Sequence, residues 1–355
     1  MVGAVSARRK TSALRLTAWG RPPSLAEVEV PDPVGPEVLV RVEAAGICQS
    51  DLHVLDADTL PYRPPFTLGH EIAGHVTALG DAASGLDVGD RVAVHGPWGC
   101  GECRRCAAGE DNYCDRRAEL AWAGAGLGRD GGMAGYVLVP HARHLVPIGD
   151  LDAAQAAPLT DAGLTPYHAV SRLALGEDPA VVVIGAGGLG HVAIQILRAT
   201  TEARVIAVDV REDALALADR SGAHRTLRTG PDTGTVLRRE TGGADAVLDF
   251  VGSDPTLALA AGILRPGGTL VIIGSGGGRL TITKPGPLPQ GASVSLPFWG
   301  SRRELAEVIA LARAGHLRVE TELFPLSAAG EAFDRLRAGR IRGRAVLLPG
   351  PLTDS

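Results

Sequence analysis

The chain has 355 residues, more than a single small core requires, and this length predicts two domains. Hydrophobic residues make up 45% of the chain and charged residues 21%, a balance that is typical of a soluble globular protein and excludes a wholly disordered one. The net charge of -5, with no run of basic residues beyond positions 8–10, argues against nucleic acid as a partner.

The N-terminal segment predicts neither a leader peptide nor a membrane anchor. Residues 1 to about 10 show no regular alternation, and we expect a loose extension there. The basic residues of this segment are not followed by an apolar region, which a secretory or twin-arginine leader would require. Glycine, proline or a charged residue interrupts every apolar stretch before it reaches about eighteen residues. We therefore expect no membrane span and a cytoplasmic protein.

Short strands dominate the first part of the chain. Residues 37–43 (EVLVRVE) alternate apolar and polar side chains, which predicts a strand with one buried face. Arg91–His95 and Tyr136–Val139 predict two more short strands, which are bounded by glycine-rich turns and separated by long loops. The first part is therefore predicted to be β-rich.

After about Pro158, strands alternate with helices. The strand patterns VVVIG, RVIAVD, AVLDFVG and TLVIIG are separated by helical patterns such as LGHVAIQILRAT and REDALALADRSG. This alternation predicts an α/β fold with a parallel, doubly wound sheet. Further on, Ser301 and Glu304 have the spacing of a capping box, which predicts a helix that ends near Gly315.

Four of the five cysteines crowd into one segment, Cys100-x2-Cys103-x2-Cys106-x7-Cys114. Four thiolates at this spacing can surround a tetrahedral zinc ion and leave no open position, which is typical of a structural site. An iron–sulfur cluster is a weaker alternative, because the last spacing is seven residues and no proline follows it. A disulfide pair fits a cytoplasmic chain poorly. The segment therefore predicts a structural zinc site.

The fifth cysteine lies in AAGICQSDLH, and the segment PFTLGHEIAGHV follows. Together with GDRV at Gly89–Val92 and the four-cysteine segment, these stretches resemble the zinc-containing medium-chain dehydrogenase/reductase family, from about residue 12 to 350. The similarity is greatest to bacterial NAD-dependent secondary alcohol dehydrogenases.

The resemblance implies a Rossmann doubly wound parallel sheet together with a β-rich GroES-like catalytic domain. The catalytic domain would be split by the inserted dinucleotide domain. The implied boundaries are 11–160 for the first part of the catalytic domain, 161–297 for the NAD-binding domain and 298–350 for the return segment.

In the family, a cysteine, a histidine and a third residue hold a catalytic zinc ion and leave one position for substrate. The match gives Cys48 and His70 as ligands and places Asp161 at the third position, where many members have a second cysteine. One thiolate, one carboxylate and a neutral imidazole balance the charge of the metal. A helix N-terminal position is the alternative for Asp161. Glu71 is an alternative ligand, or it supports the metal site from beside His70.

Three residues near Cys48 are implied to assist the chemistry. Asp51 resembles the carboxylate that holds the imidazole of His70 in one tautomer, with a surface aspartate as the alternative. Ser50 and His53 match a proton relay from the reacting oxygen, through the nicotinamide ribose, to the protein surface. An exposed loop residue without a role is the alternative for His53.

A glycine-rich turn follows the apolar strand PAVVVI and precedes a helical pattern. Such a turn lets the backbone approach a pyrophosphate, although a plain loop is the alternative. Asp209 ends the next strand, where its carboxylate can bind the adenosine ribose and repel the 2′-phosphate of NADP, so NAD is favoured. Arg211, two residues further on, would instead favour NADP, because an arginine near the ribose can bind the 2′-phosphate. By resemblance, Val251, Ile273 and Ser275 contact the adenosine and the nicotinamide carboxamide. The residues predicted in the turn are Gly185, Gly187, Gly188, Leu189 and Gly190.

Aromatic residues make up only 4% of the chain. Tyr62, Trp122, Phe298 and Trp299 fall in segments that border the zinc cleft in the family, where they would form an apolar pocket for substrate. Core packing is the alternative for any one of them. ASVSLPFWG resembles the region through which family members pair their sheets, so a homodimer or homotetramer is expected.

The sequence thus predicts an enzyme with two zinc ions per chain and NAD as cofactors. It would oxidise alcohols, secondary or aryl-substituted ones above all, reversibly to ketones or aldehydes. A polyol or threonine dehydrogenase is the alternative within enzymes. A relative that binds nucleotide without turnover is the alternative outside them.

Overall fold

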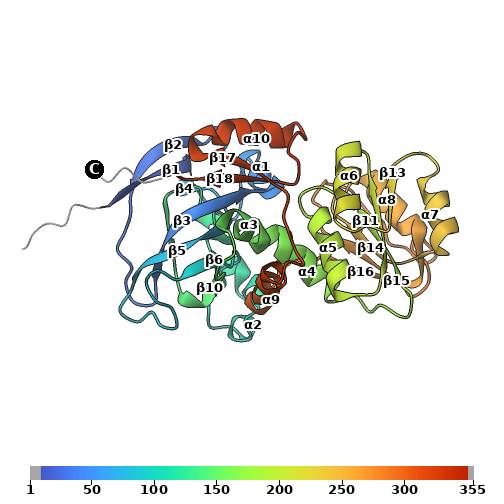
Figure 1. Ribbon diagram of the computed structural model, residues 1–355, viewed down its shortest axis with the longest axis horizontal. Helices are drawn as coiled ribbons and strands as arrows, with labels where there is room; N and C mark the ends of the chain where they lie inside the picture. The colour runs from blue at the N-terminus through green and yellow to red at the C-terminus, as the bar shows by residue number, and fades with distance from the viewer. Residues whose placement is uncertain (1–8, 351–355) are drawn as a thin grey trace, which may run out of the picture. The chain divides into compact units, whose positions relative to one another are not determined.

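The computed structural model describes residues 9–350, and the chain divides into two compact units (Figure 1). Unit 1 comprises residues 1–161, 301–313 and 321–355, and unit 2 comprises residues 162–300 and 314–320. The loose extension expected for residues 1 to about 10 lies almost wholly outside the described residues, since strand β1 (Lys10–Leu16) already begins at Lys10. Within residues 9–350, no helix has the length and apolar character that crossing a membrane requires.

Unit 1 is built on a seven-stranded sheet with the order β10-β6-β5-β3-β18-β17, in which β9 also pairs with β3. Its strands are β3 (Val38–Ile47), β5 (Glu71–Leu79), β6 (Arg91–Val94), β9 (Tyr136–Val139), β10 (Leu145–Pro147), β17 (Thr321–Pro325) and β18 (Arg344–Leu348). The three strands predicted in this part are confirmed as β3, β6 and β9. Strand β3 runs four residues further than the sequence pattern indicated, because β5 and β18 cover its last residues, and it ends directly before Cys48.

A three-stranded sheet, a two-stranded sheet of β7 (Gly124–Ala125) and β8 (Gly128–Arg129), and several short helices also belong to unit 1. The three-stranded sheet has the order β2-β1-β4, with β2 (Ser24–Glu29) and β4 (Phe66–Thr67) on either side of β1. The helices are α1 (Gln49–Leu55), α2 (Arg104–Ala107), α3 (Ala153–Pro158), α9 (Arg302–Arg313) and α10 (Ala329–Arg337). The predicted capping box of α9 is confirmed. The Glu304 carboxylate accepts a hydrogen bond from the backbone N–H of Ser301 at 2.7 Å, and the Ser301 hydroxyl accepts a hydrogen bond from the backbone N–H of Glu304 at 3.3 Å.

Unit 2 contains a six-stranded parallel sheet with the order β13-β12-β11-β14-β15-β16. The strands are β11 (Ala180–Ile184), β12 (Arg204–Asp209), β13 (Arg225–Arg228), β14 (Ala244–Asp249), β15 (Leu264–Ile272) and β16 (Ser293–Ser295). The helices are α4 (Leu164–Val170), α5 (Gly190–Thr200), α6 (Glu212–Arg220), α7 (Thr233–Thr241) and α8 (Asp254–Ile263). The core of the unit includes fully or almost fully buried side chains of three neighbouring strands, among them Val182, Ile206 and Val247. The predicted α/β fold with a doubly wound parallel sheet is confirmed.

The order of the strands fixes where a ligand can approach this sheet. From β11 the chain moves outward to β12 and β13, and then returns to the other side of β11 with β14. Ligands of open α/β sheets bind outside the carboxyl ends of the strands at such a point of reversal. The glycine-rich turn after Ile184 and the segment after Asp249 both lie at these carboxyl ends.

Candidate active site and metal centres

Four buried side chains in unit 1 converge on one point. Ligand atoms of Cys48, His70, Glu71 and Asp161 all lie within 4.8 Å of one another. The Sγ of Cys48 is 3.2 Å from Oδ2 of Asp161, and Nε2 of His70 is 3.9 Å from the same oxygen. A thiol, an imidazole and carboxylates held this closely are a ligand set for zinc. The site therefore fits a zinc ion.

The chain brings these donors together from three places. Cys48 stands between the end of β3 and the first residue of α1, while His70 and Glu71 stand at the start of the neighbouring strand β5. Gly46 is paired with Glu71 across the two strands, and a Cβ atom at position 46 would collide with the Glu71 side chain. Glycine at this position therefore leaves the space through which the Glu71 carboxylate reaches the site.

Asp161 lies in a π-helical turn, Leu159–Gly163, which follows α3. The alternative interpretation, that Asp161 is the first residue of a helix, is wrong, since α3 already begins at Ala153 and is capped by Asp152. Turns of this kind insert an extra residue into a helix and are frequent at functional sites. Asp161 is 7% exposed, so its carboxylate is buried beside Cys48 and His70.

Asp51 contacts both zinc-ligand segments. Its Oδ2 accepts a hydrogen bond from the backbone N–H of Cys48 at 2.8 Å, and its Oδ1 lies 3.3 Å from Nδ1 of His70. Burial lowers the pKa of His70, but the Asp51 carboxylate and hydrogen bonds to Asp161, Asp51 and Cys48 together raise it well above its ordinary value. A proton or a metal cation is thus strongly favoured at this point of concentrated negative charge.

Arg344 is a site residue that the sequence analysis missed. It is the first residue of β18, is 4% exposed, and forms an ion pair with the fully buried Glu71. Its guanidinium also lies 3.7 Å from Oδ2 of Asp161. The only sequence signal is an arginine directly before the apolar run AVLL. Arg344 therefore balances the charge of Glu71 within the four-residue group that fits the zinc ion.

Helix α1 connects the zinc-ligand group with the surface. The Ser50 hydroxyl is 3.6 Å from the Sγ of Cys48, and His53 follows three residues later as an exposed residue of the same helix. Residues three apart share a helix face. The two predicted relay residues thus lie on one side of α1, with Ser50 at the inner end.

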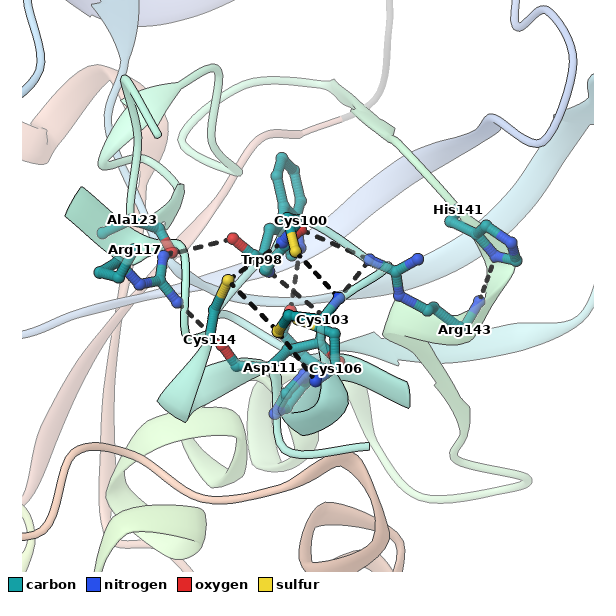
Figure 2. Close-up of polar contacts among 12 residues, drawn as sticks. Trp98, Cys100, Cys103, Cys106, Asp111, Cys114, Arg117, Ala123, His141 and Arg143 are labelled. Carbon is teal, nitrogen blue, oxygen red and sulfur yellow. Dashed lines mark hydrogen bonds and ion pairs between the residues drawn. The ribbon is translucent and has the colours of Figure 1, made fainter. Parts of the chain in front are cut away.

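The four other cysteines form a second ligand group in unit 1, in the loop of residues 100–114. Ligand atoms of the four residues lie within 4.8 Å of one another, and Figure 2 shows the sulfur atoms gathered together. Backbone N–H groups donate to three of these sulfurs at 3.4 Å, and the bond from Cys106 is the main reason that the pKa of Cys103 falls to about 6. All five cysteines are free thiols, which rules out the disulfide alternative. The ligand atoms belong to Cys100, Cys103, Cys106 and Cys114.

Two arginine side chains make polar contacts that hold this loop in place (Figure 2). Arg117 donates to the carbonyl oxygens of Asp111 and Ala123, both at 2.9 Å, and Arg143 lies 3.3 Å from Oδ1 of Asp111. Four thiolate donors with no oxygen donor or open position among them form a closed site. The group therefore fits a zinc ion that stabilises the loop without taking part in catalysis.

In unit 2, the predicted glycine-rich turn follows β11. Gly185 has φ +86°, in the left-handed region, and a Cβ atom at Gly190 would collide with the Gly185 carbonyl. A Cβ atom at Gly187 would meet no atom of the described residues within 4 Å, so the backbone there is open to a pyrophosphate. Leu189 is the cap residue of α5, and Gly188 lies between it and Gly187.

The Asp209 carboxylate is hydrogen-bonded to this turn. Its Oδ2 accepts a hydrogen bond from the backbone N–H of Ala186 at 2.8 Å, and its Oδ1 accepts one from that of Arg211 at 2.9 Å. The side chain of Arg211 lies 3.7 Å from Asp213. The carboxylate predicted to select NAD is therefore held at the end of β12, and the arginine that could favour NADP is near another acid.

Two more segments meet at the carboxyl ends of the strands. The side chain of Val251 lies close to Gly185, and the carbonyl of Val251 accepts a hydrogen bond from Gly276 at 2.9 Å. Ile273 donates its backbone N–H to Asp249 at 2.8 Å, and Ser275 follows two residues later. The predicted dinucleotide contacts thus come together within unit 2.

The aromatic residues predicted to line a substrate pocket fall in both units. In unit 1, burial raises the pKa of Tyr62 to about 12, and its ring packs edge-on against Phe66 at 5.7 Å. Trp122 instead lies under the guanidinium of Arg129, on the wall of a cavity that no catalytic zinc ligand lines. In unit 2, Phe298 is 41% exposed and its ring lies 5.2 Å from the buried Trp299.

Comparison with known proteins agrees with this architecture. Residues 35–150 match the alcohol dehydrogenase GroES-like domain, and residues 188–314 match the zinc-binding dehydrogenase family. The NAD-dependent alcohol dehydrogenase of Sulfurisphaera tokodaii is 39% identical over 351 residues, which cover 95% of this chain and 99% of the relative. The chain belongs to the zinc-containing medium-chain alcohol dehydrogenase family.

Solved structures of the family have the same fold. The alcohol dehydrogenase of Aeropyrum pernix superposes with a TM-score of 0.88 at 34% identity, over 95% of this chain and all of the other. Acetophenone reductase from Geotrichum candidum, solved in complex with NAD, gives a TM-score of 0.85 at 33% identity, over 97% and 98% of the two chains. The predictions of two zinc ions per chain and of NAD as cofactors are confirmed.

Two further comparisons bear on the finer predictions. Archaeal relatives named NAD-dependent alcohol dehydrogenase reach 36–39% identity, against 32% for the bacterial alcohol dehydrogenase of Moraxella. The prediction that the chain is most similar to bacterial enzymes is therefore not supported. The D-arabinose 1-dehydrogenase (NADP+) of Saccharolobus solfataricus is 30% identical over 96% of this chain and 98% of the relative.

Proposed function

We propose that this zinc- and NAD-dependent alcohol dehydrogenase oxidises secondary or aryl-substituted alcohols, reversibly, to the corresponding ketones and aldehydes. The observation that carries the proposal is the buried convergence of Cys48, His70 and Asp161, with the Ser50 hydroxyl beside the Cys48 sulfur. The preference for aryl-substituted substrates is supported by the similarity to acetophenone reductase, whose name gives an aryl ketone as substrate.

The residues of unit 1 have separate roles in this proposal. Cys48, His70 and Asp161 hold a zinc ion, which when bound acts as a Lewis acid that lowers the pKa of an alcohol. Asp51 fixes the tautomer of His70 through Nδ1, so that Nε2 faces the site. Ser50 would take the proton from the alcohol hydroxyl and, with NAD bound, the nicotinamide ribose would carry it on to the exposed His53 and solvent, while NAD would accept the hydride from the alcohol carbon. Burial of the ligand group excludes water from the reacting atoms.

Unit 2 supplies the dinucleotide site in this proposal, and residues 161–297 form the NAD-binding domain between catalytic segments 11–160 and 298–350. The glycine turn accommodates the pyrophosphate, Asp209 binds the adenosine ribose, and Val251, Ile273 and Ser275 contact the remaining parts of NAD. For the alcohol itself we retain Tyr62, Phe298 and Trp299 as pocket residues. Trp122 is not retained, because it lines a different cavity.

A homodimer or homotetramer forms through β16 in the proposed assembly. This strand is at the edge of the six-stranded sheet, where its partner in the described residues is β15, and Leu296 beside it is 73% exposed. An unpaired strand edge is a template for pairing with a second chain. Val294→Pro removes a backbone donor from β16 and should shift the sedimentation coefficient toward that of the monomer.

Metal analysis tests the catalytic assignment directly. The purified enzyme should contain two zinc ions per chain, and Asp161→Ala or Cys48→Ala should leave close to one and abolish alcohol oxidation. Asp58→Ala, which removes an exposed aspartate of the same unit, is the matched control and should keep both ions. Two retained zinc ions and normal turnover in Asp161→Ala would show that another residue is the third ligand.

A polyol or sugar dehydrogenase is the second candidate function. The similarity to D-arabinose 1-dehydrogenase favours it, and that relative is named for NADP. Steady-state rates with 1-phenylethanol, a primary alcohol and D-arabinose, each with NAD and with NADP, separate the candidates. The main proposal expects the highest kcat/KM for 1-phenylethanol with NAD, and a higher value for D-arabinose would replace it.

A further inference from the structure

A cavity with a volume of about 570 Å3 lies within unit 1. Its wall includes Thr11 of β1, Val28 of β2, Tyr136 of β9 and Cys100 of the four-cysteine loop, and it includes none of the catalytic zinc ligands. Sites that bind small molecules typically have volumes of about 300–1,000 Å3 and mostly apolar walls. The cavity is therefore large enough for a small ligand of its own.

Aromatic side chains form much of this wall. Trp98 is 2% exposed, while Trp122 and Tyr136 are half-buried, and all three line the cavity together with Leu39 and Leu120. Large flat rings stack on other rings or meet them edge to face. In a chain with only 4% aromatic residues, three of them around one cavity favour a ligand that contains an aromatic ring.

Arg129 is one of two arginines on a wall that also carries Glu29, Glu37 and Asp130. Its guanidinium lies 4.2 Å from the centre of the Trp122 ring, and no carboxylate of residues 9–350 forms an ion pair with it. Stacking on the tryptophan occupies the face of the guanidinium and leaves its N–H groups free along the edge, where they match a carboxylate in a bidentate geometry. The other cavity arginine, Arg143, already lies 3.3 Å from Asp111.

The acidic residues on the wall have partners of their own. Asp130 pairs with Arg15 and also accepts a backbone N–H at 2.7 Å. Glu37 accepts a backbone N–H at 3.0 Å, and Glu29 also has an interaction partner. Asp130 and Glu37 are thus already engaged, and Arg129 is the wall arginine that has no ion-pair partner within residues 9–350.

We propose that this cavity binds a small aromatic carboxylate, with its ring against the tryptophan wall and its carboxylate on Arg129. Gly99 and Cys100 also line the cavity, so the bound molecule contacts the four-cysteine loop. Ligand binding therefore slows loss of the structural zinc ion, because the loop must open for the ion to leave. The site is independent of the alcohol-oxidising site in unit 1.

Benzoate is the probe for the zinc-loaded enzyme, and benzamide is its uncharged counterpart. Calorimetric titration and quenching of tryptophan fluorescence should show that benzoate binds, with benzamide at least roughly tenfold weaker because it lacks the charge-assisted hydrogen bonds. Arg129→Gln should weaken benzoate binding by a similar factor and leave kcat for alcohol oxidation unchanged. Benzoate should also slow zinc release to a chelator in the wild type but not in Arg129→Gln.

Arg116→Gln is the matched control, because Arg116 is a half-exposed arginine of the same unit that pairs with Glu102 and does not line the cavity. It should bind benzoate as the wild type does. Arg129→Lys keeps the charge but not the bidentate geometry and should have intermediate affinity. The proposal is overturned if benzoate does not bind, if benzamide binds equally well, or if binding survives Arg129→Gln, which would show that Arg129 does not hold the carboxylate.

Discussion

Replacement of Arg344 by methionine tests the charge balance of the catalytic site. Arg344 is 4% exposed and its partner Glu71 is 0% exposed, so water screens this ion pair very little. Methionine fills much of the same volume but leaves the Glu71 carboxylate buried without its cation. Loss of one partner of a buried ion pair typically costs about 3–5 kcal/mol, and we expect the free energy of unfolding of unit 1 to fall by about that amount.

Urea unfolding of the zinc-loaded protein, followed by fluorescence, measures this effect. Arg303→Met is the control, because Arg303 is 88% exposed and its pairing with Glu307 is of the i,i+4 type, worth about 0.5 kcal/mol or less. The double variant Glu71→Met/Arg344→Met should be more stable than Arg344→Met alone, since it buries no unpaired charge. A cost for Arg344→Met no larger than that of the control would refute this reasoning.

Three further predictions concern the other sites. Burial lowers the pKa of His191 to about 4, so below about pH 6.5 the unfolded chain binds a proton that the folded chain does not. The free energy of unfolding should therefore fall by up to about 3 kcal/mol from pH 7 to pH 4. His191→Gln should flatten this pH dependence, which urea titrations at each pH measure. Cys100→Ser should lower the zinc content from two ions to one per chain and lower the melting temperature. Asp209→Ser should raise the ratio of kcat/KM with NADP to that with NAD by roughly tenfold or more, and an unchanged ratio would argue against its role in selecting NAD.

Local patterns in the sequence were sufficient for the parallel α/β sheet and for the four-cysteine site, whereas the catalytic zinc ligands and the split catalytic domain came from the resemblance to the family. The four cysteines of one loop and the alternation of strands and helices can each be recognised within a short stretch of sequence. The ion pair of Arg344 and Glu71 cannot be recognised in this way, because it depends on β18 pairing with β3 while β3 pairs with β5. Such pairing joins residues that are far apart in sequence, so no period or spacing reports it.

Two other outcomes have the same physical origin. The sequence does not distinguish an aspartate that begins a helix from one that lies in a π-helical turn, because in both cases a polar residue stands among helix-forming residues. The structure places Asp161 in the π-helical turn. Trp122 comes from the long stretch between β6 and β9, where loops and not periodic elements decide the direction of a side chain. The structure turns this ring toward Arg129, a contact that only the folded loop creates.

The place of Arg344 at the start of the last strand sets the order in which the catalytic site can mature during synthesis. All the thiol, imidazole and carboxylate donors have been synthesised by residue 161, before any strand of the nucleotide-binding sheet has been made. The guanidinium that pairs with Glu71 belongs to β18, which is synthesised after all the donors and after the six strands of the nucleotide-binding sheet. A nascent chain thus carries a site with surplus negative charge that attracts divalent cations, and the site acquires its final charge only when β18 closes the sheet.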